Sequence, residues 1–131
     1  MERRWWVSLS IGYAAGIFVL SSFPLPDSPF LSAHGLDKLI HAAEYAVFFL
    51  LLRRASSGRA WIALLIAVLY AGSDELHQAF VPGRHAGFDD FSADLAGIAL
   101  MAVLLAVLRR SPLPGRIGRR ILESVISRKE D

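Results

Sequence analysis

The sequence predicts an all-α integral membrane protein: a bundle of four transmembrane helices with both termini in the cytoplasm. The composition is the first reason, because 54% of the 131 residues are hydrophobic and the mean hydropathy is +0.44. A soluble chain of this length has no interior large enough to hide so much apolar surface. The second reason is that the apolar residues gather in four runs, and the third is that the basic residues gather at one set of their ends.

The first apolar run covers residues 5–23 and follows Arg3 and Arg4. Its length is close to the roughly 20 residues that a membrane-spanning helix needs. No small-residue cleavage site follows the run, and prolines end it, so we interpret it as a retained span rather than a signal peptide. Gly12 and Gly16 form a G-x-x-x-G pattern, which is a weak indication of a close-packing face.

Three further runs complete the predicted bundle. The second, residues 37–52, is short and interrupted by charges, so by itself it also fits an amphipathic helix on the membrane surface. Residues 61–80 form a clear third span and residues 90–108 a fourth. The transmembrane domain is therefore predicted over residues 1–110. The remainder, residues 111–131, is predicted to be a basic cytoplasmic tail whose apolar residues have the spacing of an amphipathic surface helix.

The basic residues set the predicted orientation. Twelve of the fourteen Lys and Arg residues lie on one side of the bundle: two before the first span, three between the second and third, and seven after the fourth. Only Lys38 and Arg84 fall on the other side. The positive-inside rule therefore places both termini in the cytoplasm, which an even number of spans requires.

Composition also excludes some partners. The chain has no cysteine, so neither disulfides nor a thiolate metal site is available. The net charge of +2 does not indicate nucleic acid, because the arginines flank apolar runs instead of forming a basic stripe. The partner that we expect first is the lipid bilayer itself.

Polar chemistry is predicted to gather at the extracytoplasmic side, which receives all four histidines and eight of the twelve acids. At about 1.5 Å per helical residue, Glu44, Asp74 and Asp94 reach a similar depth, roughly 10 Å below the outer membrane boundary. An ionisable group at that depth costs a few kcal/mol unless it faces the bundle interior, a partner or water. We therefore expect these three carboxyl groups to converge beneath Arg84.

The predicted site is an outward-facing polar pocket. His41, Glu44 and Asp74 are the candidate acid–base groups, because buried and like-charged acids are suited to proton transfer. Arg84 lies in a turn beside many acids and is expected to be an ion-pair hub or a clamp for phosphate or carboxylate. No cofactor is expected, and a metal held by His41, Glu44 and Asp74 is the less favoured alternative. The ligand-binding candidates are Asp37, Lys38, Tyr45, Glu75, Gln78, Arg84, Asp90 and Asp94.

Four motifs with fixed spacing follow one another along the chain. They are Asp37-Lys38-x-x-His41-x-x-Glu44-Tyr45, Asp74-Glu75-Leu76-His77-Gln78, Phe80-Val81-Pro82-Gly83-Arg84 and Asp90-x-x-x-Asp94-x-x-Gly97. In this order they resemble the VanZ-like family of small bacterial membrane proteins. One departure is Asp94, where that family often has asparagine. The resemblance implies a bacterial inner-membrane protein of the cell envelope. The name-giving member is associated with low-level resistance to the glycopeptide teicoplanin, and the resemblance implies no defined reaction.

Three functions are compatible with these residues. In the first, the pocket binds or modifies an envelope lipid headgroup or a cell-wall-related molecule, so that the ligand is lipid-linked or anionic. In the second, the polar cluster only holds the bundle together and the protein acts by binding a partner. The third, a transport or proton-relay unit, is disfavoured because the cytoplasmic halves of the spans are apolar. The residues leave open whether the protein is an enzyme.

Overall fold

The computed structural model describes residues 2–24, 35–84 and 86–110, and within these ranges it contains four helices and no strand. The all-helical prediction is confirmed for this part of the chain. The tail predicted over residues 111–131 lies outside the described residues. The helices are α1 (Arg3–Ser21), α3 (Leu36–Ala55), α4 (Ala60–Gln78) and α5 (Phe88–Arg110).

Local sequence explains where the helices begin and end. Gly35 has a positive φ of 64° directly before α3, a conformation that costs glycine little. Between α3 and α4, Ser57 and Gly58 both have positive φ, and the Gly58 amide donates to the Arg53 carbonyl at 2.9 Å. This tight connection makes α3 and α4 antiparallel neighbours. α3 continues to Ala55, three residues beyond its predicted apolar run, because arginine is a good helix former.

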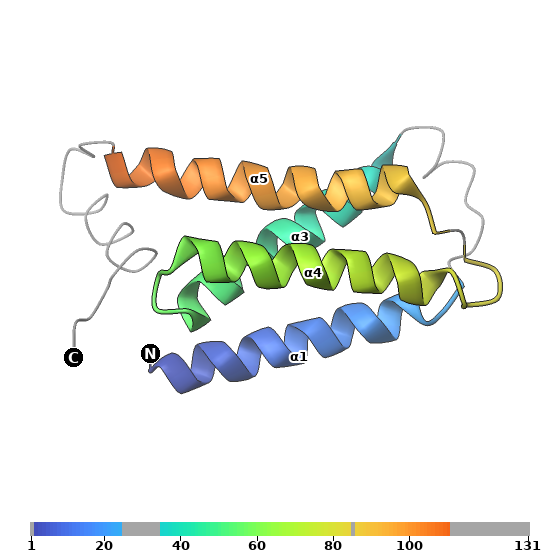
Figure 1. Cartoon of the computed structure of the whole chain (residues 1–131), viewed down its shortest axis with the longest axis horizontal. Coiled ribbons are helices and arrows are strands. Elements are labelled where there is room, and N and C mark those ends of the chain that lie inside the picture. The colour runs from blue at the N-terminus through green and yellow to red at the C-terminus, as the bar shows by residue number, and fades with distance from the viewer. Residues whose placement is uncertain (1, 25–34, 85, 111–131) are drawn as a thin grey trace.

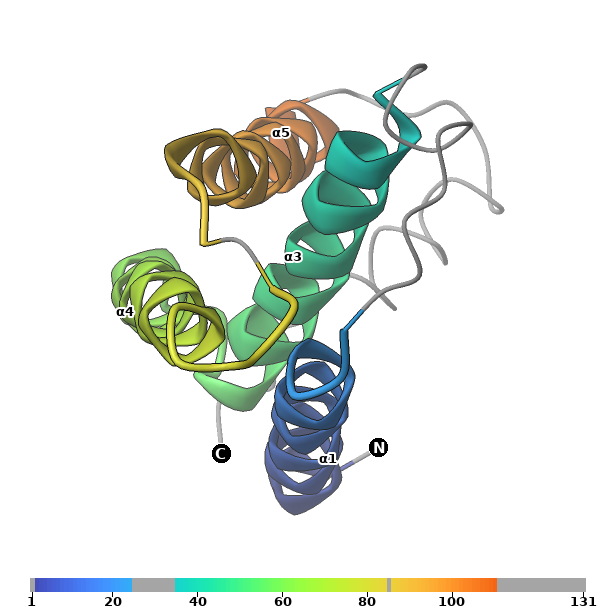
Figure 2. The same cartoon turned by 90° about the vertical axis from the view of Figure 1, so that its right-hand side faces the viewer.

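Successive helices run in opposite directions along the long axis of the molecule (Figure 1). α3 lies in the middle, with α1, α4 and α5 arranged around it (Figure 2). Thus α3, whose charged residues also fitted a helix on the membrane surface, is the central helix of the bundle. Its Tyr45, Phe48, Phe49 and Leu52 supply much of the buried core.

Small residues let the helices approach this core closely. Ala63, Ala67 and Ala71 form one fully buried edge of α4. A Cβ atom added at Gly97 of α5 would overlap the Ala42 carbonyl of α3, so the two backbones touch there. The glycine pair of α1, in contrast, has no neighbouring atom within 4 Å of an added Cβ. The indication of a close-packing face at Gly12 and Gly16 is therefore wrong within the described chain.

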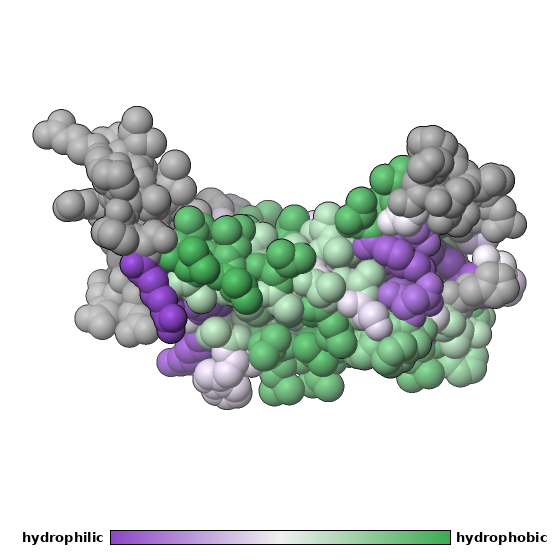
Figure 3. All heavy atoms as spheres, turned by 90° about the horizontal axis from the view of Figure 1, so that it is seen from above, coloured by the Kyte–Doolittle hydropathy of each residue, from purple (hydrophilic) through white to green (hydrophobic). Residues whose placement is uncertain are grey.

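The outer surface of the bundle is strongly apolar. Large hydrophobic side chains such as Ile11, Leu69 and Leu100 are more than 60% exposed. Figure 3 shows an apolar band between two polar ends of the molecule. Only α4 and α5 are long and apolar enough to cross a membrane by the criteria of length and hydropathy; α1 and α3 do not meet them. The surface and these two helices indicate a membrane protein.

The two ends of the bundle carry opposite charge. At one end, which we call the arginine end, Arg3 Nε donates to the Ala55 carbonyl at 3.1 Å and the Arg54 guanidinium lies 4.7 Å from the centre of the Trp6 ring. Arg109, near the C-terminal end of α5, lies beside Gly58 in the connection between α3 and α4. The opposite end, the acidic end, contains the predicted site.

Candidate functional site

The polar side chains of the acidic end divide into three groups, which we name by their members. The α1–α4 cluster consists of Ser21, Ser22, Asp74, His77, Gln78 and Arg84. The Lys38 group consists of Asp37, Lys38, Asp89 and Asp90. The inner site consists of His41, Glu75 and Asp94.

Asp74 is the centre of the α1–α4 cluster. Its side chain lies on the buried face of α4, where the row of small residues ends, and the residue is only 5% exposed. Ser21 Oγ donates to Asp74 Oδ1 at 2.6 Å, and Gln78 Nε2 donates to Oδ2 at 2.9 Å. Both carboxylate oxygens therefore have a partner, and the Ser21 bond links α4 to α1.

His77 adds a second link between the same helices. Its ring stacks on Phe18 with 4.4 Å between the ring centroids, and its Nε2 lies 3.0 Å from Ser22 Oγ. A histidine at the end of a helix is often only solvated, but this one packs against α1.

Arg84 stabilises the end of α1 instead of acting as the expected ion-pair hub. Its Nε donates to the Phe23 carbonyl at 2.8 Å, and its Nη2 donates to the Leu20 carbonyl at 2.7 Å. The last carbonyls of a helix have no partner within the helix, and a cation there also interacts favourably with the helix dipole. The guanidinium thus ties the α4–α5 connection to α1.

The hub of ion pairs is Lys38. Its ammonium group lies 3.3 Å from Asp37 and 2.7 Å from Asp89, and it also contacts Asp90. The Asp89 side chain is 69% exposed, whereas that of Asp90 is 16% exposed. One ammonium group is therefore shared by three carboxylates, and together they connect α3 to the start of α5.

The inner site lies one helical turn further along the same two helices. His41 Nδ1 is 3.1 Å from Asp94 Oδ1, and His41 Nε2 is 3.9 Å from Asp90. Asp94 is completely buried, because the contact of Gly97 with Ala42 draws α5 onto α3 beside it. Its second oxygen, Oδ2, has no hydrogen-bond partner among the described residues.

Glu75 brings the third helix into this site. Its Oε2 accepts a hydrogen bond from the Gly87 amide at 3.0 Å, whereas its buried Oε1 has no partner among the described residues. One ligand atom from each of His41, Glu75 and Asp94 can be chosen so that all three lie within 4.8 Å of one another. Three helices therefore deliver an imidazole and two carboxyl groups to one point.

Glu44 and Tyr45 lie between the inner site and the α1–α4 cluster. Glu44 is partly buried and interacts electrostatically with Asp74 and Asp94, the two acids with which it was expected to converge. Tyr45 is completely buried against Phe48, and its hydroxyl group has no hydrogen-bond partner among the described residues. Tyr45 is therefore placed under the site and has no direct access to its opening.

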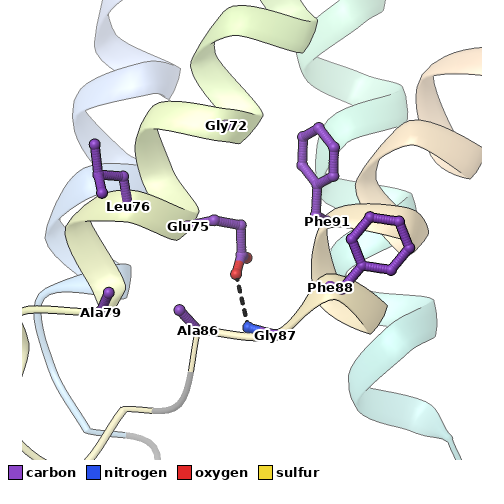
Figure 4. A pocket seen from close by; sticks show the side chains of 8 residues that line it. All are labelled: Gly72, Glu75, Leu76, Ala79, Ala86, Gly87, Phe88 and Phe91. Carbon is purple, nitrogen blue, oxygen red and sulfur yellow. Dashed lines mark hydrogen bonds between the residues drawn. The ribbon is translucent and has the colours of Figure 1, made fainter.

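A groove of about 440 Å³ opens between α4 and α5 beside the inner site. Glu75 is the one charged member of its lining and points into it (Figure 4). The Phe88 side chain, at 85% exposure, stands at its edge. The groove thus combines an apolar wall with a single carboxyl group. Its lining residues are Gly72, Glu75, Leu76, Ala79, Ala86, Gly87, Phe88 and Phe91.

Sequence reasoning did not select several of these residues. Ser21 and Ser22 had been interpreted only as part of a helix exit, although two hydroxyls at the end of an apolar run are a signal for an interhelical partner. Phe88 and Phe91 have the i, i+3 spacing of one helix face, next to the acids that open α5. That aromatic pair was the available signal for the groove.

Comparison with known proteins gives one match. Residues 4–109, which include nearly all of the four helices, match the sequence profile of a protein family described as VanZ/LLP1. No curated protein and no solved structure matches the chain.

Proposed function

Because the chain belongs to the VanZ/LLP1 family, we propose that it is a VanZ-like protein of the bacterial inner membrane that binds an envelope lipid at the inner site. All four helices then span the bilayer, within a transmembrane domain of residues 1–110, and both termini are cytoplasmic. Helices of 19 to 23 residues are about 30 Å long, which matches the hydrocarbon core. The arginine end supports the cytoplasmic orientation, and the acidic end then faces outward.

One observation carries the proposal: Glu75 belongs both to the apolar groove and to the inner site. The groove opens between α4 and α5, which are the two most clearly membrane-compatible helices. An acyl chain can lie against Leu76, Phe88 and Phe91, which exchanges one apolar environment for another, while the polar headgroup reaches Glu75. Lipid would enter laterally from the outer leaflet.

Charge narrows the class of headgroup. The two cations expected to hold an anionic ligand are already engaged, Lys38 with three acids and Arg84 with carbonyl groups of α1. Glu75 Oε1 and Asp94 Oδ2 have no hydrogen-bond partner among the described residues, and Glu75 is the one of the two that lines the groove. A headgroup that donates, such as the ammonium group of phosphatidylethanolamine, therefore fits better than a simple anionic one. Binding is the proposed activity, and the residues assign no reaction to it.

In the structural alternative, polar residues only hold the bundle together. The contacts of the α1–α4 cluster favour this alternative, and those of the inner site do not. Both oxygens of Asp74 have partners, and Arg84 caps α1. These contacts hold helices together and give each Asp74 oxygen a partner within the protein. We therefore assign the α1–α4 cluster to stability and the inner site to binding.

The test is binding of labelled phosphatidylethanolamine by the full chain purified in detergent. Glu75→Gln removes the charge while keeping an acceptor for the Gly87 amide, and Phe88→Ala removes a groove wall. We expect each to weaken binding by about fivefold to tenfold, the effect of losing roughly 1–1.4 kcal/mol. Phe80→Ala is the matched control, because Phe80 is 80% exposed at the same end but does not line the groove. Equal binding by all three variants and the wild type would refute the proposal.

The link to glycopeptide resistance that the family name suggests has its own test. Cells that express the wild type are compared with cells that express Glu75→Gln at equal membrane abundance, and teicoplanin susceptibility is measured. A protective effect that needs Glu75 would connect the site to resistance. Equal susceptibility would show that the inner site is not linked to resistance. It would not bear on the lipid-binding proposal.

A further inference from the structure

We propose that His41, Glu75 and Asp94 form a binding site for one divalent transition-metal ion at the inner wall of the groove. The three side chains come from α3, α4 and α5, and their ligand atoms lie within 4.8 Å of one another. Nitrogen and oxygen ligands that share one zinc ion at about 2 Å are separated by roughly 3–3.5 Å. The 3.1 Å between His41 Nδ1 and Asp94 Oδ1 is already in that range. Closing the remaining separations, none of which exceeds 4.8 Å, would complete the set.

A second observation points to a ligand at this place. Asp94 is completely buried, and its Oδ2 has no hydrogen-bond partner among the described residues. Glu75 Oε1 is also buried and without a partner there. Buried polar atoms almost always have a partner, so two unpaired oxygens on carboxyl groups that meet one histidine require an explanation. A cation bound by Glu75 and by both oxygens of Asp94 would give these atoms a partner.

The charge balance leads to the same conclusion. The ammonium group of Lys38 is shared by Asp37, Asp89 and Asp90, so it does not neutralise the inner site. Glu44 adds a further nearby carboxyl group. A divalent cation would balance the charges of Glu75 and Asp94, which otherwise repel each other in a poorly solvated place.

The ligand atoms select the class of ion. One imidazole nitrogen with two carboxylates suits Zn²⁺, Mn²⁺ or Fe²⁺, whereas Ca²⁺ and Mg²⁺ prefer oxygen ligands throughout. Three protein ligands leave at least one coordination position open. The metal set considered from the sequence, which included Asp74, is less suitable because both Asp74 oxygens already accept hydrogen bonds from Ser21 and Gln78. The metal site goes beyond lipid binding and does not depend on it, but both proposals use the unpaired oxygens of Glu75 and Asp94, so an ion and an ammonium headgroup would compete for them.

The experiment uses the full chain in lipid-free detergent. The protein is stripped with a chelator, the chelator is removed, and Zn²⁺ and Mn²⁺ are titrated separately by calorimetry, with Mn²⁺ also followed by electron paramagnetic resonance. We expect one ion per chain. Glu75→Gln and Asp94→Asn should each lower the affinity by more than about tenfold, since even indirect contacts of metal sites often contribute that much.

Asp89→Asn is the matched control, because it also converts an acid to an amide nearby but contacts Lys38 and not His41. It should bind metal as the wild type does. The inference is overturned if the wild type binds no stoichiometric ion, which would mean that a proton satisfies the carboxyl groups. It is also overturned if the three variants bind equally. Should Asp94→Asn fail to fold, Glu75→Gln decides alone, since Glu75 is only partly buried.

Lipid binding is measured in parallel on chelator-treated protein. If no metal ion binds while phosphatidylethanolamine still binds, only the metal site is refuted. Metal binding without lipid binding, whether the protein is metal-free or metal-loaded, refutes only the lipid proposal. The two accounts are therefore tested separately.

Discussion

The α1–α4 cluster and the inner site lie at the same end of the bundle, and both contain a buried aspartate, but their atoms are paired very differently. Asp74 has a partner for each oxygen, whereas Asp94 has an oxygen without a hydrogen-bond partner in the part of the chain that the structure describes. A group whose hydrogen bonds are all made within the protein stabilises the fold. A buried group with an unpaired acceptor atom is available to bind a ligand or an ion. We therefore propose that the pairing of atoms, and not the depth of the acid, separates structural from functional polar residues here.

Four predictions test this contrast, in order of decreasing expected effect on stability. The first disturbs the contact that holds α5 against α3 beside the inner site. Gly97→Ala should lower the free energy of unfolding by about 3 kcal/mol, because its Cβ would overlap the Ala42 carbonyl and backbone cannot move away as a side chain can. Thermal unfolding in detergent measures the effect. Gly16→Ala is the control, since open space surrounds Gly16. A loss of stability as large in Gly16→Ala would contradict the packing described here.

The second prediction breaks the α1–α4 cluster alone. Asp74→Ala leaves Ser21 and Gln78 without their buried acceptor and should cost about 2 kcal/mol of stability. The folded fraction should still bind lipid. Unfolding curves and lipid binding measured on the same preparations check this. Loss of binding without loss of stability would place Asp74 in the functional site instead.

The third prediction concerns the cap of α1. Arg84→Gln should destabilise the protein by about 1 kcal/mol, because two carbonyl groups at the end of α1 lose a charged donor. Hydrogen exchange should rise in the last turn of α1 and remain unchanged in α5. Uniform exchange across both helices would show that Arg84 does not act on α1 specifically.

The fourth prediction is the counterpart of the second. Asp94→Asn should change stability by less than about 1 kcal/mol, in either direction, because it replaces an incompletely paired buried acid with a neutral group of the same shape. Metal and lipid binding should fall nevertheless. A destabilisation as large as that of Asp74→Ala would show that Asp94 is structural too.

The sequence was sufficient for the helices and insufficient for the division of the site. Long apolar runs predict α4 and α5 directly, and charge ends the apolar run of α3 before its helix ends at Ala55. Counting residues along each helix predicted that Glu44, Asp74 and Asp94 lie at a similar depth in the membrane. The rotation of each helix about its axis, which sends Asp74 toward α1 and Asp94 toward α3, depends on packing around the central helix. The role of Arg84 could not be predicted from the sequence either. Its carbonyl partners lie about 60 residues earlier in the chain, at the end of α1.

The most direct test of the central claim compares the matched variants Asp74→Asn and Asp94→Asn. Binding of phosphatidylethanolamine is measured per folded molecule, alongside the unfolding midpoint of each protein. The account predicts that Asp74→Asn unfolds earlier but binds as the wild type does, whereas Asp94→Asn unfolds near the wild-type midpoint and binds at least about fivefold more weakly. The reverse pattern, or equal losses of both properties in both variants, would contradict it.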